Sequence, residues 1–228
     1  MNTIYKIKLY LSLLRYRGLK RKLHYSRNRE DLFLINYFKD TLKGRYIDVG
    51  AYHPFRNSNT YLLYKKGWTG INIDLSKTSI DLFKLARPKD INLNLAISDV
   101  RKKIKVYQNK DLGMMNTINP KYASLYLEKF RAKETWSNNL NNILEEYDFK
   151  NRKFELIDID AEGSDYLILK NIDFEKYSFK LILVETHQWN SYTKKETDKI
   201  YSLLKSKKYN YLKQLGETTI FENTNWTN

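Results

Sequence analysis

The stretch that decides the fold is YIDVGAYHPFRNSNTYLLYKKG, residues 46–67. Its apolar start predicts a strand over 45–49, and its end predicts a helix over 58–66 that stops at Gly67. Between them a glycine, a proline and a polar run share one turn, in a chain with only 8 glycines and 3 prolines. A glycine there lets the backbone bend sharply and lets a ligand approach closely. We therefore expect this unit to hold a ligand, with a purely structural turn as the alternative.

The alternation of strand and helix continues along the chain. Further strands are expected at 70–74, 91–97, 103–107, 154–160 and 180–185, and further helices at 30–43, 78–86, 164–172 and 194–207. The polar and helical segment 108–151 shows no clear strand, and the last residues predict a hairpin around Gly216. This pattern indicates an α/β fold with a mostly parallel sheet flanked by helices and a C-terminal antiparallel hairpin.

Composition is typical of one compact domain. The chain has 228 residues, 42% of them hydrophobic, and it has no cysteine. The lack of cysteine excludes disulfides and cysteine-bound metals and fits a reducing compartment. No run of about 18 uncharged apolar residues could span a membrane, and the charged N-terminal segment lacks the features of a secretory signal. We therefore expect a cytoplasmic protein, located at the inner face of the membrane if its N-terminal segment binds lipid.

Positive charge is concentrated at the N-terminus. The net charge is +15, and residues 1–29 hold nine Lys and Arg and no acid, so 15 minus 9 leaves +6 for residues 30–228. This distribution argues against a nucleic-acid partner. Ile4, Ile7, Leu11 and Leu14 recur at helical spacing, which predicts a basic amphipathic helix that lies on an anionic membrane. The alternative is a helix that packs on its own domain and solvates its basic side. We expect a basic helical segment over 1–29 and one domain over 30–228.

Acidic residues follow the first two predicted strands. Asp48 and Gly50 end the first, and Asp74 ends the second, where a carboxylate can accept hydrogen bonds from a ribose. The helix start over 57–60 offers N–H groups to a ligand carboxylate. Neither GxGxxG nor GxxxxGK[ST] occurs, so cradles for a pyrophosphate or a triphosphate are not favoured. S-adenosylmethionine, with its ribose, adenine and amino-acid end, fits this pattern.

A second acidic group occupies residues 158–172, which read DIDAEGSDYLILKNI. Asp158, Asp160, Glu162 and Asp165 place four carboxylates within eight residues. Such crowding is costly unless cations or protons compensate it, and a sulfonium ligand is itself a cation. The alternative is that some of these acids only cap the helix that follows.

These segments together resemble the FkbM-type S-adenosylmethionine-dependent methyltransferases. The resemblance lies in residues 46–74, in LNLAISD (93–99), in IDIDAEGSDYLILKNIDF (157–174) and in LILVETH (181–187). It covers about residues 30–222 and implies a Rossmann-like class I methyltransferase fold. One departure is the loop Ala51-Tyr52-His53-Pro54, where many members have a short turn containing glycine. The resemblance implies a cofactor site of Asp48, Gly50, Ala51, Asn57, Ser58, Asn59, Thr60, Asp74, Ala96, Asp99 and Asp160.

The implied reaction is methyl transfer to a hydroxyl of a sugar or glycan precursor, as in surface polysaccharide biosynthesis. A hydroxyl is a weak nucleophile at neutral pH, so a base or a metal should assist. His187 is the preferred base, followed by His53 and Asp160, and the alternative for each histidine is a hydrogen-bonded loop residue. A Mg, Mn or Fe ion would be held by Asp160, Glu162 and His187. Acceptor contacts are expected from Asn116, Thr117, Glu162, Asp165, His187 and Trp189.

The expected acceptor is a small molecule or a nucleotide-linked sugar. Two alternatives stay open: a methyltransferase of a polyketide or another small molecule, and a non-catalytic binding module held at a membrane by its basic segment. The intact residues Asp48, Gly50, Asp74, Asp160 and Glu162 favour an enzyme. The sequence does not indicate the oligomeric state.

Overall fold

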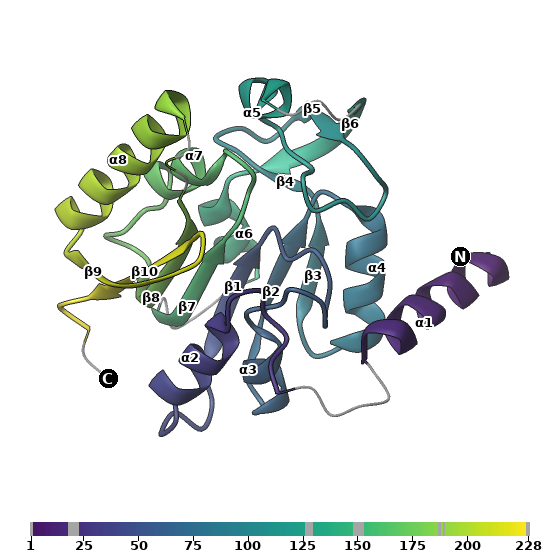
Figure 1. Cartoon of the computed structure of the whole chain (residues 1–228), viewed down its shortest axis with the longest axis horizontal. Helices are drawn as coiled ribbons and strands as arrows, with labels where there is room; N and C mark the ends of the chain where they lie inside the picture. The colour runs from purple at the N-terminus through teal and green to yellow at the C-terminus, as the bar shows by residue number, and fades with distance from the viewer. Residues whose placement is uncertain are drawn as a thin grey trace.

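The structure is a computed structural model that describes residues 2–17, 23–125, 130–147, 153–186, 188 and 190–226. A seven-stranded sheet forms the centre, helices cover both of its faces, and a three-stranded sheet lies beyond one end of its strands (Figure 1). Within the described ranges, no helix combines the length and the apolar character that crossing a bilayer requires.

The large sheet has the strand order β3-β2-β1-β7-β8-β10-β9. The first five of these strands run parallel, and β10 is antiparallel to both β8 and β9. The expected Rossmann-like fold with a C-terminal antiparallel hairpin is confirmed. The strand order reverses at the junction of β1 and β7, which is where open α/β sheets bind ligands. The strands are β1 Arg45–Val49, β2 Thr69–Asp74, β3 Ile91–Asn94, β7 Lys153–Ile159, β8 Ser178–Glu185, β9 Tyr209–Leu215 and β10 Thr218–Asn223.

Alternating side chains of the central strands build two separate cores. Ile157 packs with Leu204 in a cluster beneath α6, α7 and α8, while its neighbour Leu156 packs with Leu34 and Trp68 beneath α2 and α3. Successive residues of a strand point to opposite faces, so apolar runs in β1, β7 and β8 serve both cores. The covering helices are α2 Glu30–Tyr37, α3 Tyr61–Lys65, α4 Lys77–Ala86, α6 Leu140–Glu146, α7 Asp165–Lys170 and α8 Ser191–Ser206.

The small sheet contains a strand that the sequence did not predict. It has the order β4-β6-β5, formed by β4 Ala96–Ile97, β6 Arg131–Asn138 and β5 Lys103–Gln108, with α5 Pro120–Ser124 between β5 and β6 in the chain. The expectation of no strand in 108–151 was therefore wrong. β6 is charged and mostly exposed, so it lacks the apolar alternation of a half-buried strand, and it forms by pairing antiparallel with β5.

Two other predicted elements have different bounds. The expected strand over 91–97 is divided at Leu95, where the chain leaves β3 in the large sheet and enters β4 in the small one. The helix expected over 30–43 ends at Tyr37. The division at Leu95 brings the small sheet over the ends of β1 and β2, and this places a second wall around the ligand-binding edge.

The N-terminal helix α1, Thr3–Arg17, lies outside α4 at the right of Figure 1. Leu9 and Leu13 are buried against Leu82 and the side chains of Phe55 and Tyr61. The hydroxyl of Tyr5 also donates a hydrogen bond to Asp81 of α4. The helix thus packs on the domain, as the alternative interpretation of the basic segment expected.

Candidate active site

The carboxyl ends of four parallel strands meet at one edge of the large sheet. Val49 at the end of β1 pairs with Ile73 of β2 on one side and with Ile159 of β7 on the other. Ile159 in turn pairs with Val184 near the end of β8. The residues that end or follow these strands, Gly50, Asp74, Asp160 and Glu185, therefore lie along a single edge.

Gly50 allows the ends of β1 and β7 to come together. Its φ is +84°, and a Cβ atom built on it would lie 1.8 Å from the carbonyl oxygen of Asp160. Its N–H donates to the carbonyl of Ile73, and the N–H of Asp160 donates to the carbonyl of Val49. No residue with a side chain fits this position, because both the space and the left-handed backbone exclude it. Tight backbone packing is thus one answer to why the turn contains glycine.

A cavity opens above this edge. Its floor is formed by the ends of β1, β2 and β7, and its outer wall by the segment 113–118. The lining residues are Val49, Gly50, Tyr52, Ile73, Asp74, Leu75, Leu95, Ile97, Gly113, Met114, Asn116, Ile118, Asp160, Ala161, Glu162, Ser164 and Ile168.

Asp74 stands at the cavity with its carboxylate held in place by the backbone. Oδ2 accepts a hydrogen bond from the N–H of Tyr52 at 2.8 Å, and Oδ1 accepts one from the N–H of Ser76 at 2.6 Å. Burial raises the pKa of Asp74 to about 6, while these two N–H groups act to lower it. Each oxygen keeps a further lone pair, so the group can accept two hydroxyl hydrogen bonds from a ribose.

Two buried polar side chains at the cavity have no protein partner among the described residues. They are the amide of Asn116, both of whose polar atoms are unbonded, and the hydroxyl of Ser164. Asn116 is only 8% exposed and Ser164 only 4%. A buried polar group without a partner costs about 1–3 kcal/mol, which a bound ligand or water would recover. Both residues thus point to a polar ligand in the cavity.

The outer wall is fastened to the turn that follows β7. The hydroxyl of Thr117 donates to the carbonyl of Glu162 at 2.7 Å, and the amide of Asn119 donates to the carbonyl of Gly163 at 2.6 Å. Tyr122 adds a hydrogen bond from its hydroxyl to the Glu162 carboxylate. Thr117, which was expected to touch an acceptor, is fully buried and bonds the turn, whereas its neighbour Asn116 faces the cavity.

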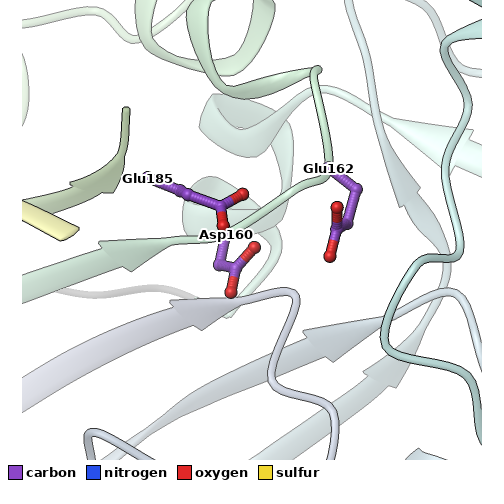
Figure 2. A group of neighbouring side chains, drawn as sticks. All are labelled: Asp160, Glu162 and Glu185. Atoms are coloured by element: carbon purple, nitrogen blue, oxygen red, sulfur yellow. The ribbon is translucent and has the colours of Figure 1, made fainter. Parts of the chain in front are cut away.

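Three carboxyl groups gather at one end of the cavity (Figure 2). One oxygen from each of Asp160, Glu162 and Glu185 lies within 4.8 Å of the others. Asp160 and Glu185 share a hydrogen bond, and Glu162 approaches from the turn before α7. We call this group the carboxylate cluster. Desolvation, followed by repulsion among neighbouring acids, raises the pKa of all three well above their ordinary values.

The other two acids of the 158–172 segment have different surroundings. Asp165 accepts hydrogen bonds from the N–H groups of Ala161 and Gly163, so it closes the turn at the start of α7. It does not cap α7 itself, because Ser164 is the N-cap and no side-chain capping hydrogen bond forms there. Asp158 is buried beside Asp48, its register neighbour, and desolvation and the Asp48 charge raise its pKa well above the usual range.

Asp48 belongs to a buried network below the turn and does not line the cavity. Its Oδ2 accepts a hydrogen bond from Thr60, whose hydroxyl accepts one in turn from the guanidinium of Arg87. Arg87, fully buried, also donates to the carbonyl of Pro54 and the hydroxyl of Ser58. Burial raises the pKa of Asp48 to about 6, while Thr60 and Arg87 act to lower it. We call Asp48, Ser58, Thr60, Arg87 and Asp90 the arginine network.

His53 is a buried anchor of the turn between β1 and α3. Its Nδ1 accepts hydrogen bonds from the N–H groups of Phe55 and Arg56, both at 3.1 Å. An accepting Nδ1 carries no proton, so these contacts fix the ring as the tautomer protonated at Nε2. His53 does not line the cavity, and its geometry is that of the hydrogen-bonded loop residue weighed from the sequence.

Several residues expected at the cofactor lie elsewhere. Ala51 and Ala96 are buried without lining the cavity, and Asp99 is exposed beside the small sheet. Ser58 and Thr60 belong to the arginine network, and Asn59 hydrogen-bonds Asp158. The amide of Asn57 donates to the sulfur of Met114, which lines the cavity. Gly50, Asp74 and Asp160 do line the cavity, as do Asn116 and Glu162 from the expected acceptor set. His187 and Trp189 lie outside the described residues, so their expected roles stay predictions.

Residues missed from the sequence include Ser164 and Glu185 at the two pockets and Arg87 in the arginine network. Glu185 could have been found, because the rule that placed Asp160 at a strand end applies equally to the last residue of LILVE. Arg87 gave no such signal, since an arginine between a predicted helix and a proline is ordinarily solvated.

The fold is an open α/β sheet with a cavity at its switch point, which is where such sheets bind ligands. The chain belongs to the FkbM methyltransferase family, because the model of the methyltransferase FkbM domain matches residues 48–211, more than half of the sequence. It is therefore an S-adenosylmethionine-dependent methyltransferase.

Other comparisons give weaker likenesses. A TehB-like S-adenosylmethionine-dependent methyltransferase from Corynebacterium glutamicum is 12% identical, with a TM-score of 0.46 over 98% of this chain and 100% of that one. A protein from Klebsiella pneumoniae, provisionally described as an O-methyltransferase, is 10% identical, with a TM-score of 0.47 over 98% and 90% of the two chains. No curated protein sequence matches this chain.

The cavity fits the cofactor of this family. Asp74 offers acceptors for the ribose, and Leu95 and Ile97 offer apolar walls to the adenine. Asn116 and Ser164 supply unsatisfied polar atoms, and Asp160 and Glu162 offer carboxyl oxygens to a sulfonium and an amino group.

Proposed function

We propose that the protein transfers the methyl group of S-adenosylmethionine to a hydroxyl of a sugar or glycan precursor. The observation that carries this proposal is the carboxylate cluster, which lies between the donor cavity and a second, smaller pocket. Asp160 and Glu162 line the donor cavity, and Glu185 lines the second pocket. A hydroxyl in the second pocket would thus meet acceptor oxygens beside the transferred methyl group.

The second pocket has the chemistry of a sugar subsite. Its lining residues are Tyr122, Gly163, Asp165, Tyr166, Glu185, Thr193, Glu196, Thr197 and Ile200. Carboxylates accept hydrogen bonds from vicinal hydroxyls, and tyrosine rings pack on the apolar face of a pyranose. Among the described residues that line either pocket, none is Lys or Arg. A nucleotide-linked acceptor would therefore enter with its sugar end and keep its phosphates outside.

The chain's own residues do two things in this reaction. The bound cofactor supplies an electrophilic methyl group on a positively charged sulfur. Asp74 and the cavity walls would hold the donor beside the second pocket, and such positioning supplies much of the acceleration. The Asp160–Glu185 pair would accept the proton of the hydroxyl that takes the methyl group, and the demethylated cofactor would leave as a neutral thioether. A carboxylate of raised pKa is a stronger base for this step.

A divalent metal is the second way to activate the hydroxyl. Three carboxylate oxygens within 4.8 Å suit a hard cation such as Mg²⁺ or Mn²⁺. The ligand set would then be Asp160, Glu162 and Glu185, with Glu185 where the sequence suggested His187. A chelator should abolish turnover and added Mg²⁺ or Mn²⁺ should restore it if a metal acts, and neither treatment should matter if the carboxylates act alone.

The test uses the full chain with methyl-labelled S-adenosylmethionine and two acceptor panels. One panel contains nucleotide-activated sugars and free glycosides, and the other contains phenols and polyketide alcohols of similar size. We expect label to enter a sugar hydroxyl, with the position read by mass spectrometry. Transfer to the second panel alone would exclude the sugar proposal while leaving the methyltransferase activity established.

A further inference from the structure

The N-terminal helix α1 has two apolar faces, and only one of them packs on the protein. Tyr5, Leu9, Leu13 and Tyr16 form the inner face and meet α4 and the turn after β1. Ile4, Ile7, Leu11 and Leu14 project from the outer face and are between 53% and 66% exposed. The stripe that the sequence marked as the apolar face of the helix is therefore the one that its own domain leaves uncovered.

The outer stripe is continuous along the helix. At about 100° per residue, Ile4, Ile7, Leu11 and Leu14 fall within about 80° of one another on the helix surface. Tyr10, which is also exposed, extends the same stripe on one side. Solvated helices of soluble domains rarely present four large aliphatic side chains in one row. An uncovered stripe of this kind needs an apolar occupant.

Basic side chains border the stripe on both sides. Lys8 and Arg15 lie along one edge, and Lys6 lies along the other, all three exposed. Residues 1–29 contain no acid, so nothing in this segment offsets their charge. Long basic side chains beside an apolar stripe can place their ammonium and guanidinium groups among phosphates while the stripe enters the acyl boundary. Such a surface complements an anionic bilayer better than it complements a second copy of the same basic segment, which would repel it.

We propose that the outer face of α1, formed by Ile4, Ile7, Leu11 and Leu14 and bordered by Lys6, Lys8 and Arg15, docks the protein on an anionic membrane surface. The inner face stays packed on α4, so the helix lies flat on the membrane without leaving the domain. Each exposed aliphatic side chain adds favourable free energy when it leaves water for the acyl region. Each basic side chain adds electrostatic attraction to anionic lipid. This docking surface is separate from the proposed acceptor chemistry.

The inner face of α1 contacts the turn that borders the donor cavity. The ring of Tyr16 meets the edge of His53 with centroids 4.8 Å apart, and Arg56 donates a hydrogen bond to the Tyr16 hydroxyl at 3.0 Å. His53 and Arg56 belong to the turn whose Tyr52 lines the cavity. A membrane-bound α1 would therefore hold this turn, and with it the donor cavity, close to the lipid surface.

Flotation with vesicles tests the proposal on the full chain. The vesicles are either pure phosphatidylcholine or a mixture with phosphatidylglycerol. The parent protein should bind the mixed vesicles, bind the neutral ones far less, and dissociate as salt is added, because screening weakens the attraction. Leu11→Glu should lower binding at least about tenfold, and Lys8→Glu with Arg15→Glu should lower it roughly 10–100-fold.

Matched controls lie in the loop after α2, at the other side of the molecule (Figure 1). Leu42→Glu changes an exposed leucine in the same way as Leu11→Glu, and Lys39→Glu with Lys43→Glu makes the same change in net charge as the basic pair. These controls should bind as the parent does, and all variants should keep the parent's thermal unfolding midpoint. The proposal is overturned if the parent ignores anionic vesicles, if it binds neutral ones equally, or if Leu11→Glu binds like Leu42→Glu. It is also overturned if the parent is a dimer in the absence of lipid and Leu11→Glu converts that dimer to monomers.

Discussion

The arginine network and the carboxylate cluster place the same kind of side chain, from neighbouring strands of one sheet, in opposite circumstances. Asp48 is inside β1, where the hydroxyl of Thr60 links it to the buried guanidinium of Arg87. Asp160 follows β7, Glu185 ends β8, and the described lining of their cavity offers no cation. An acid that is linked to a buried cation within the fold stabilises the turn. Acids without a cation at a cavity remain able to bind a ligand or accept its proton.

The largest expected effect separates the two regions by activity. Asp160→Asn and Glu185→Gln should each lower turnover by roughly 10²–10⁴-fold, because the acceptor hydroxyl loses its proton acceptor. Glu185 does not line the donor cavity, so Glu185→Gln should leave donor affinity unchanged by calorimetry. Glu175→Gln, at an exposed glutamate, is the control. If His187→Ala alone lowers turnover and removes the ascending limb of the pH–rate profile, the base is His187 and not the cluster.

The next effect concerns stability and belongs to the arginine network. Arg87→Met should lower the free energy of unfolding by about 3–5 kcal/mol, since it leaves Asp48 and Asp90 buried without their cation. Lys84→Met, at an exposed position of α4, the helix that Arg87 follows, should change the free energy of unfolding little. Urea unfolding followed by circular dichroism measures both. An equal, small loss in the two variants would mean that the network does not hold the turn.

Donor affinity should respond to Asp74 and not to Asp99. Asp74→Ala should weaken S-adenosylmethionine binding by roughly 1.5–3 kcal/mol, because the ribose loses a charged acceptor. Asp99→Ala is the matched control, since Asp99 is exposed and outside the cavity lining. If calorimetry shows comparable losses of donor affinity in the two variants, the result would support the adenine contact that the family resemblance implied for Asp99.

The smallest effect is a pH dependence of the same site. The pKa of Asp74 is raised by burial from 3.8 to about 6, so its carboxylate becomes protonated as the pH falls below about 6. Donor affinity should then fall up to about tenfold per pH unit and reach a plateau above that value. Protonation favours the folded state here, so the contribution of Asp74 to the free energy of unfolding should rise between about pH 6 and 3.8 and be lost as pH rises through about 6. A flat affinity profile between pH 5 and 7 would remove Asp74 from ribose binding.

The sequence by itself determined the sheet and its ligand-binding edge. Apolar runs ending in Gly50, Asp74 and Asp160 predicted parallel strands, and residues at the carboxyl ends of such strands share one edge whatever packs around them. The C-terminal hairpin around Gly216 was equally local, because turn chemistry and strand alternation both lie within a few residues. These features depend on periodicity along the chain, which a single sequence displays in full.

Only the tertiary structure decided what each of these residues touches. Arg87 reached Thr60 across 27 positions of sequence and took Asp48 out of the predicted cofactor site, while Glu185 joined Asp160 from the next strand. Pairing with β5 made β6 a strand, and packing on α4 chose Leu9 and Leu13 over the outer stripe of α1. Burial, charge compensation and the choice between two apolar faces depend on partners distant in sequence, and the pattern of one segment carries no record of those partners.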